Sequence, residues 1–272
     1  MNDTGRLAIH TATTKPWDLE TAIRKYAEAG VAGISVWKEA LEGRDPAAAG
    51  AAIRAVGLKA VSLVRGGFFP APDPETRSAR IRDNERLIRA AAQLGAPLLV
   101  LVCGAHPKVR IAEARAQVRA GIEAVLPLAE REGVRLAVEP LHPMYAGDRS
   151  VINTMKEALD LCERIGSPAL CVAVDVYHVW WDPELEAQIE RAGRLGTLAA
   201  FHVCDWKTPL EDMLEDRGLM GEGCIDIPRI RAWVEKAGFR GFAEVEIFSK
   251  RFWAMDQDEY LGLILKAFRE HV

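Results

Sequence analysis

The sequence lacks the features that mark membrane, secreted and nucleic-acid-binding proteins. Its most apolar run, which begins at Pro97, has about half the length of a membrane-spanning helix. The first residues contain no basic region followed by an apolar stretch, so we expect no signal peptide. A formal net charge of −4 indicates no basic surface for DNA, RNA or an anionic membrane. These absences predict a soluble, cytoplasmic protein without nucleic-acid or membrane partners.

Paired cysteines and a dinucleotide-binding motif are also missing. The chain has five cysteines, none of them in a CxxC pair, and three lie within or at the end of apolar runs: Cys103, Cys171 and Cys204. This spacing excludes a structural zinc site and predicts reduced, mostly packed thiols. No GxGxxG motif follows the first apolar run, which argues against a Rossmann domain.

What the sequence does contain is a repeated alternation of short apolar runs and amphipathic segments. Runs that are apolar almost without interruption are typical of parallel strands buried on both faces. We expect eight such strands, at residues 7–10, 33–37, 59–64, 97–103, 135–139, 171–175, 199–203 and 242–248.

The segments between these strands have the pattern of helices, with apolar residues three or four positions apart and capping residues at their ends. The clearest are 18–30, 74–94, 111–132, 154–165, 226–236 and 256–270. Strict alternation of strand and helix requires a parallel sheet. No linker or change of composition divides the 272 residues. We therefore predict one domain, residues 1–272, folded as a (β/α)8 TIM barrel of the α/β class.

Four residues that can bind a metal end four consecutive predicted strands: Glu139, Asp175, His202 and Glu246. Barrel enzymes place their chemistry at the carboxyl ends of the strands, where neighbouring side chains converge. A single Glu or His at such a position is often only a cap or a packing residue. Three carboxylates at one mouth repel each other unless a cation neutralises them. Such a ligand set suits Mn²⁺, Mg²⁺ or Co²⁺, and zinc less well.

Strand 8 offers two glutamates that point to the same face, because Glu244 and Glu246 are two positions apart. We favour Glu246 as the ligand because it lies nearer the end of the strand, which leaves Glu244 one layer down.

The segments VEPLHP (138–143), VAVDVYH (172–178), FHVCDW (201–206), GEGCIDIP (221–228) and VEIF (245–248) carry a family resemblance. In this order they resemble the sugar phosphate isomerase/epimerase superfamily of xylose isomerase-like TIM barrels. The resemblance implies that Glu139, Asp175, His202 and Glu246 bind the metal and that His178 contacts the substrate. In the epimerases an arginine follows the strand 7 histidine by several residues. Here that stretch reads DWKTP, so either Lys207 substitutes or the contact is absent.

Other polar and aromatic residues at strand ends are candidates for substrate binding. His10, Trp37 and Arg65 end strands 1, 2 and 3, and Trp206 follows strand 7. Five of the seven tryptophans follow predicted strands, which predicts an aromatic rim around the mouth. Aromatic side chains in such a rim can stack against the C–H faces of a sugar or against an aromatic aglycone. They can equally serve to pack the top of the barrel or to form a subunit interface. We expect a substrate larger than a triose or tetrose.

The site predicts proton abstraction alpha to a carbonyl, through an enediolate intermediate. The resemblance implies that Glu139 and Glu246 transfer the protons. We therefore predict a metal-dependent isomerase or epimerase that acts on a keto-sugar, with Mn²⁺ as the most suitable metal. His142 is a further candidate base, and a loop hydrogen bond is its equally plausible alternative role. A base with a pKa near neutrality would favour a lyase that cleaves 3-keto-glycosides by β-elimination.

Two further alternatives are a non-enzymatic sugar-binding barrel and an AP endonuclease. An AP endonuclease needs a metal cluster rich in histidine and a basic surface, whereas this chain has six histidines and an acidic balance. The expected partner is a small carbohydrate. The sequence leaves open whether the chain forms a homo-oligomer or needs a partner subunit to complete the site.

Overall fold

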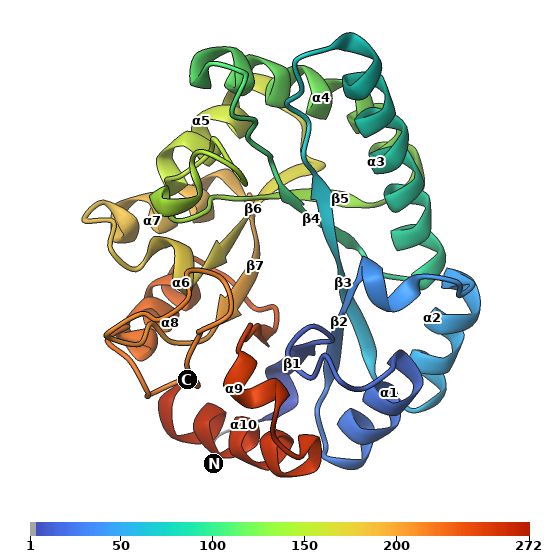
Figure 1. The fold of residues 1–272 in the computed structure, drawn as a ribbon, viewed down its shortest axis with the longest axis vertical. Helices are drawn as coiled ribbons and strands as arrows, with labels where there is room; N and C mark the ends of the chain where they lie inside the picture. Colours follow the sequence, from blue (N-terminus) through green and yellow to red (C-terminus); the bar gives the residue numbers. More distant parts are fainter. Residues whose placement is uncertain (1–3) are drawn as a thin grey trace.

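The computed structural model describes residues 4–272 and shows a closed barrel of eight parallel strands (Figure 1). Each strand pairs with the next along the chain, and β1 closes the ring against β8. The predicted (β/α)8 fold is confirmed. The strands are β1 Leu7–His10, β2 Gly33–Trp37, β3 Lys59–Gly67, β4 Leu98–Val102, β5 Arg135–Glu139, β6 Leu170–Asp175, β7 Leu198–Val203 and β8 Ala243–Val245.

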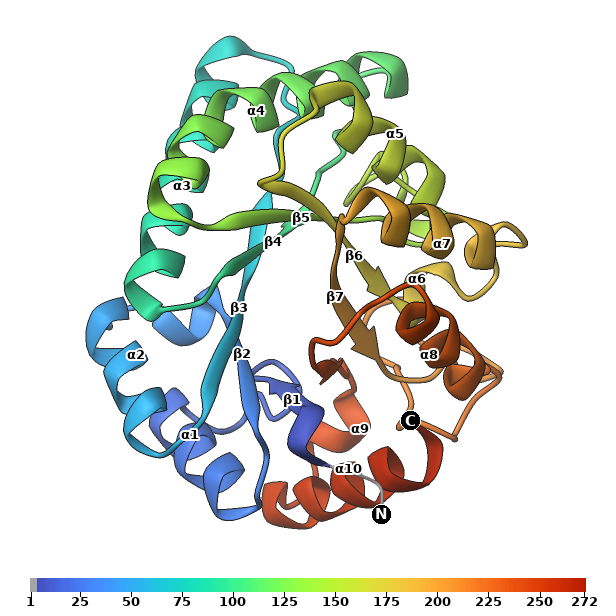
Figure 2. The same ribbon diagram turned by 180° about the vertical axis from the view of Figure 1, so that it is seen from behind.

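Helices form a ring outside the strands, visible from both ends of the barrel (Figures 1 and 2). The α-helices are α1 Leu19–Glu28, α2 Pro46–Ala55, α3 Pro74–Leu94, α4 Ile111–Glu132, α5 Met155–Ile165, α6 Val176–Val179, α7 Leu185–Leu195, α8 Ile227–Lys236, α9 Lys250–Trp253 and α10 Gln257–His271. Three short 3₁₀ helices are η1 Thr4–Arg6, η2 Lys38–Leu41 and η3 Pro143–Tyr145.

Capping residues set the ends of the longer helices. The Asp18 side chain accepts a hydrogen bond from the Thr21 N–H at the start of α1, as its position in the sequence predicts. Thr154 and Glu157 form a reciprocal capping box at the start of α5. Gly95 ends α3 with φ of 80°, a left-handed conformation that glycine adopts without strain. Local sequence therefore determines where these helices begin and end.

Two strands differ from their predicted limits by more than one residue. Strand β3 continues to Gly67, with an irregularity between Val64 and Gly66, so Arg65 lies within the strand rather than after it. Strand β8 ends at Val245, three residues before the predicted end. Beyond it the Ile247 N–H donates to Thr13 Oγ1 at 3.0 Å instead of continuing the sheet. Glu246 therefore follows strand β8 directly, at the rim of the barrel.

Apolar side chains fill both the inside of the barrel and the layer between strands and helices. The inner cluster comprises Val64, Leu98, Val100, Ala137, Cys171, Ala173 and Ala200. The outer, much larger cluster joins the strands to the surrounding helices.

All five cysteines are free thiols, and Cys224 is the exposed one. Across residues 4–272, none of the helices combines the length and apolar character needed to span a membrane.

Candidate functional site

The four predicted metal ligands converge at the carboxyl end of the barrel. Glu139, Asp175, His202 and Glu246 each offer one ligand atom, and these atoms all lie within 4.8 Å of one another. All four side chains are buried, with at most 4% of each residue exposed. Their order along the chain explains the convergence, because β5 to β8 are neighbours and the first three residues belong to the ends of their strands. Their role as ligands remains a prediction.

The two glutamates of strand 8 lie at different depths. Glu246 belongs to the four-residue cluster at the mouth. Glu244 pairs in the sheet with His202 and lies deeper, where Ser35 and Ser62 donate hydrogen bonds to its Oε2 at 2.5 and 3.2 Å. The same oxygen lies 3.8 Å from His202 Nε2. Glu244 is therefore placed as a supporting carboxylate behind His202.

An arginine that the sequence analysis missed lies inside the site. Arg217 Nη1 donates to Asp175 Oδ2 at 3.0 Å and to Glu246 Oε2 at 2.9 Å, and the residue is 3% exposed. Lys207, the proposed substitute for the epimerases' arginine, instead pairs with Asp216. Arg217 comes from further along the loop after β7, and whether Lys207 substitutes for the epimerases' arginine or that contact is absent stays a prediction. An Arg before Gly in an irregular loop gives no periodic signal that would have revealed it.

Electrostatics in the cluster are dominated by burial and by an excess of carboxylates. Burial raises the pKa of Asp175 to about 7, against the opposing influence of Arg217. Burial alone would lower the pKa of His202, but Glu244, Glu139 and Glu246 outweigh it and raise that pKa to about 10. Burial also opposes ionisation of Glu246, yet His10 and Arg217 hold its pKa well below the usual value. The site therefore attracts positive charge strongly.

The residues present fit a divalent cation. Glu139 Oε1, His202 Nδ1 and Glu246 Oε1 are buried and have no hydrogen-bond partner. His202 Nδ1 lies 2.9 Å from Glu139 Oε1, an approach without hydrogen-bond geometry. Buried polar atoms without partners are costly, and a cation between them would satisfy all three. Three carboxylates and one imidazole form a ligand set that suits manganese, magnesium, cobalt or zinc.

Two predicted substrate-binding histidines lie against this cluster in different ways. His178 Nε2 lies 3.2 Å from Arg217 Nη2 and 3.6 Å from Asp175 Oδ2, and burial lowers its pKa well below the usual value. His10 lies beneath the mouth, where its Nδ1 is 3.0 Å from Glu246 Oε1 and its Nε2 is 3.3 Å from Glu244 Oε2. His178 can reach a substrate, whereas His10 is enclosed by protein groups.

Trp206 and His142 belong to an aromatic cluster beside the site. The Trp206 ring lies 4.9 Å from the His142 ring, 4.8 Å from Tyr177 and 5.6 Å from Trp180. His142 Nδ1 accepts a hydrogen bond from the Met144 N–H at 3.2 Å, so the neutral ring carries its proton on Nε2. Burial lowers its pKa. This geometry favours the loop-stabilising role of His142 over its role as a base.

The mouth contains two adjoining cavities. The inner compartment, of about 90 Å³, is lined by Glu139, Glu246, His178 and Arg217 together with apolar and aromatic side chains. The outer compartment, of about 410 Å³, lies between the β1–α1 loop, η2 and the loop after β7. Trp37 and Arg65 line both, and their contact with a substrate stays a prediction. Trp206 and His10 line neither.

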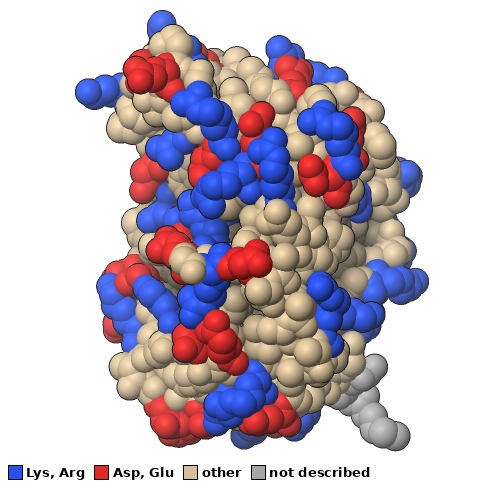
Figure 3. All heavy atoms as spheres, turned by 90° about the vertical axis from the view of Figure 1, so that its right-hand side faces the viewer, with Lys and Arg blue, Asp and Glu red and all other residues tan. Residues whose placement is uncertain are grey.

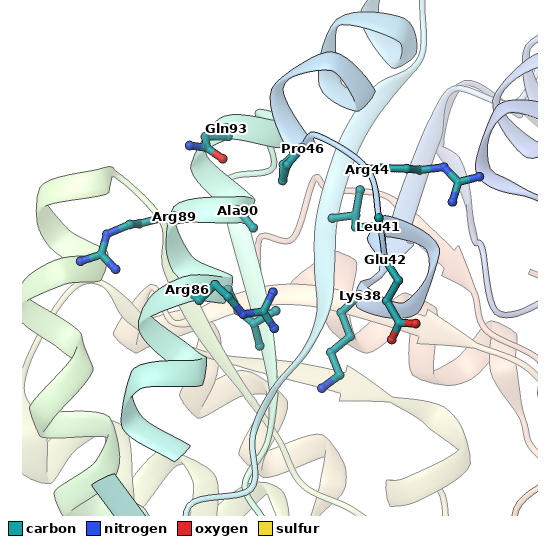
Figure 4. Close-up of a pocket in the computed structure, with 11 residues that line it drawn as sticks. Lys38, Leu41, Glu42, Arg44, Pro46, Arg86, Arg89, Ala90 and Gln93 are labelled. Atoms are coloured by element: carbon teal, nitrogen blue, oxygen red, sulfur yellow. The ribbon is translucent and has the colours of Figure 1, made fainter. Parts of the chain in front are cut away.

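A separate hollow of about 620 Å³ lies outside the barrel, between the η2–α2 segment and α3 (Figure 4). Lys38, Arg44, Arg86 and Arg89 line it, and Arg89 and Arg44 point outward on opposite sides. The face formed by α2 and α3 carries a band of basic side chains with acidic ones between them (Figure 3). This hollow shares no residue with the carboxylate cluster, and we assign it no part in catalysis.

Comparisons with known proteins agree with this architecture. The chain is 46% identical to a protein from Sinorhizobium meliloti 1021 whose crystal structure superposes with a TM-score of 0.95, covering 98% of both chains. The structure of the IolI protein with a zinc atom is 19% identical, with a TM-score of 0.84 and 96% of each chain covered.

A curated relative, the inosose isomerase of Halalkalibacterium halodurans, is 21% identical over 206 residues, covering 74% of this chain and 71% of the relative. The profile of the xylose isomerase-like TIM barrel family matches residues 23–271. The resemblance inferred from the ordered motifs is thereby confirmed. The chain belongs to the xylose isomerase-like TIM barrel family.

Proposed function

We propose that the protein is a divalent-metal-dependent isomerase or epimerase acting on a keto-sugar. The observation that carries this proposal is the buried convergence of Glu139, Asp175, His202 and Glu246 at the barrel mouth. A relative named as an inosose isomerase supports the same class of chemistry. The predicted substrate is a small carbohydrate, and the inner compartment with its mixture of polar and aromatic groups suits such a ligand.

The four clustered residues would hold the metal, most suitably Mn²⁺. Zinc is an alternative, supported by the zinc atom in the IolI structure. When bound, such an ion polarises a carbonyl oxygen and makes the neighbouring C–H more acidic. Glu139 Oε1, His202 Nδ1 and Glu246 Oε1 support this assignment independently of any relative, because these buried atoms have no hydrogen-bond partner and a cation between them would accept a lone pair from each.

Two carboxylates of the site can move the proton. Glu139 ends β5 and Glu246 follows β8, so they reach the inner compartment from different parts of the barrel wall. One carboxylate removes the proton alpha to the carbonyl, and the electron pair of the broken C–H bond forms an enediolate. Return of a proton to the other face gives the epimer, and return to the neighbouring carbon gives the isomer.

Arg217 and His178 would prepare this reaction. Arg217 donates to both Asp175 and Glu246, which keeps Glu246 ionised and therefore able to accept a proton. His178 lies against Arg217 and lines the inner compartment, where it can donate or accept a hydrogen bond with a sugar hydroxyl. Burial of the whole cluster excludes water and strengthens each of these interactions.

The test is solvent-deuterium incorporation into a panel of keto-sugars, with Mn²⁺ or Zn²⁺ supplied. We expect exchange at the carbon alpha to the ketone, and a loss of about 10²–10⁴-fold in Glu139→Gln and in Glu246→Gln. Glu270→Gln, which removes an exposed carboxylate on α10, is the matched control and should exchange like the parent. Absence of exchange with every keto-sugar would reject the proposal.

A further inference from the structure

The hollow between the η2–α2 segment and α3 concentrates positive charge in a chain whose formal net charge is −4. Its wall carries four basic residues, Lys38, Arg44, Arg86 and Arg89, and one acidic residue, Glu42. The side chains of Lys38 and Arg86 extend from opposite sides into the space between α3 and the η2–α2 segment (Figure 4). Basic side chains around a concave surface reinforce one another's field, so this hollow should attract anions.

Much of this positive charge is available to a ligand. Across residues 4–272, no ion pair or side-chain hydrogen bond engages Lys38 or Arg89. Arg86 pairs with Asp83 at 2.8 Å, but both side chains are exposed, with 66% and 39% of their surface accessible. Exposed ion pairs are weak because water screens them, so an anion can compete with Asp83 for Arg86.

Apolar side chains also line the hollow. Leu41 and Pro46 come from the η2–α2 segment, and Leu87 and Ala90 come from α3. A carbon skeleton or a ring can pack on this surface while its charged group lies between the basic side chains. The hollow is open to solvent, and its volume of about 620 Å³ is within the range of small-molecule sites.

The distribution of charge favours a small ligand over a macromolecule. Acidic side chains lie between the basic ones along the face formed by α2 and α3 (Figure 3). A nucleic acid placed across this face would meet these carboxylates, whereas Glu42 is the acidic residue among those that line the hollow. A phosphoryl group carries a charge of about −1.5 to −2 near pH 7, and guanidinium groups bind its oxygens in pairs. One or two phosphoryl groups would therefore neutralise the excess of four basic residues over one acidic residue.

We propose that this hollow binds a small organic phosphate. The phosphoryl group lies between Lys38 and Arg86, and the carbon skeleton packs against Leu41 and Leu87. A carboxylate carries less charge than a phosphoryl group and would leave more of the positive excess without a partner. A nucleotide and a phosphorylated sugar both supply a phosphoryl group attached to a ring, and direct titration distinguishes them.

The proposed phosphate site is separate from the carboxylate cluster at the barrel mouth. η2 lies between the hollow and the outer compartment of the mouth: Lys38 and Leu41 line the hollow, whereas Glu39 and Ala40 line the outer compartment. Arg44 lines both, and a carboxylate outside the hollow already accepts two hydrogen bonds from its guanidinium. Binding of a phosphate here requires neither the proposed metal nor a keto-sugar, so it can be tested without either.

The test is isothermal titration of the chelator-treated protein with inorganic phosphate, AMP, glucose 1-phosphate and adenosine. Removal of metal ions prevents the anions from binding to a metal in the barrel mouth. We expect AMP or glucose 1-phosphate to bind at least about tenfold more tightly than inorganic phosphate, because the ring adds apolar contact. Adenosine lacks the phosphoryl group and should not bind measurably. The organic phosphate that binds more tightly identifies the kind of ring.

Charge reversal in the wall should remove this binding. The double variant Arg86→Glu, Arg89→Glu should bind the preferred organic phosphate more than about 100-fold more weakly, and Lys38→Gln about tenfold more weakly, because charge-assisted hydrogen bonds are lost. The matched control is Arg80→Glu, Arg82→Glu, which makes the same charge change at exposed positions of α3 outside the hollow and should bind like the parent. Circular dichroism and the Tm of each variant check that it folds.

Absence of binding by all three phosphates would overturn the proposal, and so would equal affinity for inorganic phosphate and both organic phosphates. Parental affinity in Arg86→Glu, Arg89→Glu and in Lys38→Gln would place the anion elsewhere on the protein. Equal losses in the two double variants would mean that α3 attracts anions without a defined site. Each of these results would leave the proposed function standing, because that function depends on the carboxylate cluster.

Discussion

The two halves of the barrel mouth have opposite chemical character. The ends of β5 to β8 contribute Glu139, Asp175, His202 and Glu246, all buried and charged or chargeable. Strands β2 to β4 contribute Trp37, Arg65 and Val102, which line the inner compartment with aromatic and apolar surface and one cationic side chain. Under the proposed function, the first half performs the chemistry and the second recognises the substrate. Changes in the two halves should therefore affect different measurements.

The largest effect is expected from His202→Ala in the charged half. His202 is the one nitrogen ligand of the proposed set, and its Nδ1 faces Glu139 at 2.9 Å. The variant should lose Mn²⁺ affinity by more than about 100-fold, since even an outer partner of a ligand contributes 10–100-fold, and should lose exchange activity. Metal titration followed by electron paramagnetic resonance measures the affinity. Trp37→Ala, from the aromatic half, is the control and should bind Mn²⁺ with the affinity of the parent. If His202→Ala also bound Mn²⁺ with the parental affinity, the ligand assignment would be refuted.

A smaller effect, on stability rather than on chemistry, is expected from Arg217→Met. Removing Arg217 leaves Asp175 and Glu246 buried without their counter-ion, which costs about 3–5 kcal/mol of the free energy of unfolding. Denaturant unfolding in the presence of a chelator measures this loss. Added Mn²⁺ should raise the Tm more in the variant than in the parent, because the cation replaces the missing positive charge.

Arg217→Lys keeps the charge and serves as the matched control, with most of the stability retained. Unfolding of Arg217→Met at the parental denaturant concentration would show that the two carboxylates do not depend on this arginine.

A third test addresses the layer beneath the mouth. Glu244 lies behind His202, 3.8 Å from its Nε2, and receives hydrogen bonds from two serines. Carboxylates in this position fix the orientation of a metal-binding imidazole, so Glu244→Gln should weaken metal binding by about 10–100-fold. Isothermal titration with Mn²⁺ is the measurement, with Glu270→Gln as a control for the loss of one negative charge. An unchanged dissociation constant would mean that Glu244 only fills the barrel interior.

The smallest effect should come from the basic hollow beside α3. Arg86 and Arg89 are separated from the carboxylate cluster, and Arg86 pairs with Asp83 on the same helix. The double variant Arg86→Glu, Arg89→Glu should bind Mn²⁺ and catalyse exchange like the parent, with stability changed by less than about 1 kcal/mol for two surface substitutions. A reduced rate in this variant would extend the functional surface well beyond the barrel mouth.

The same pattern of apolar runs in the sequence predicted most of the fold and also the convergence of Glu139, Asp175, His202 and Glu246. Uninterrupted apolar runs locate buried parallel strands, and the closing residues of adjacent parallel strands must lie together. Arg217 could not be found in this way, because it reaches the carboxylates from an irregular loop. The surroundings of His142 and Trp206 were equally hidden, since contacts between loops depend on packing that has no sequence period.

Closure of the ring by β1 and β8 has a consequence for how the chain acquires its structure. Leu7 pairs with Ala243, so the first strand finds its partner almost at the other end of the chain. Until that pairing forms, both strands present unpaired edges that can associate with other molecules. Contacts between such distant segments slow folding, because the chain loses the conformational entropy of a long loop before the contact contributes any stabilising free energy. A chain shortened before β8 would keep its first seven strands and expose two sheet edges, and we expect it to aggregate rather than to remain a smaller barrel.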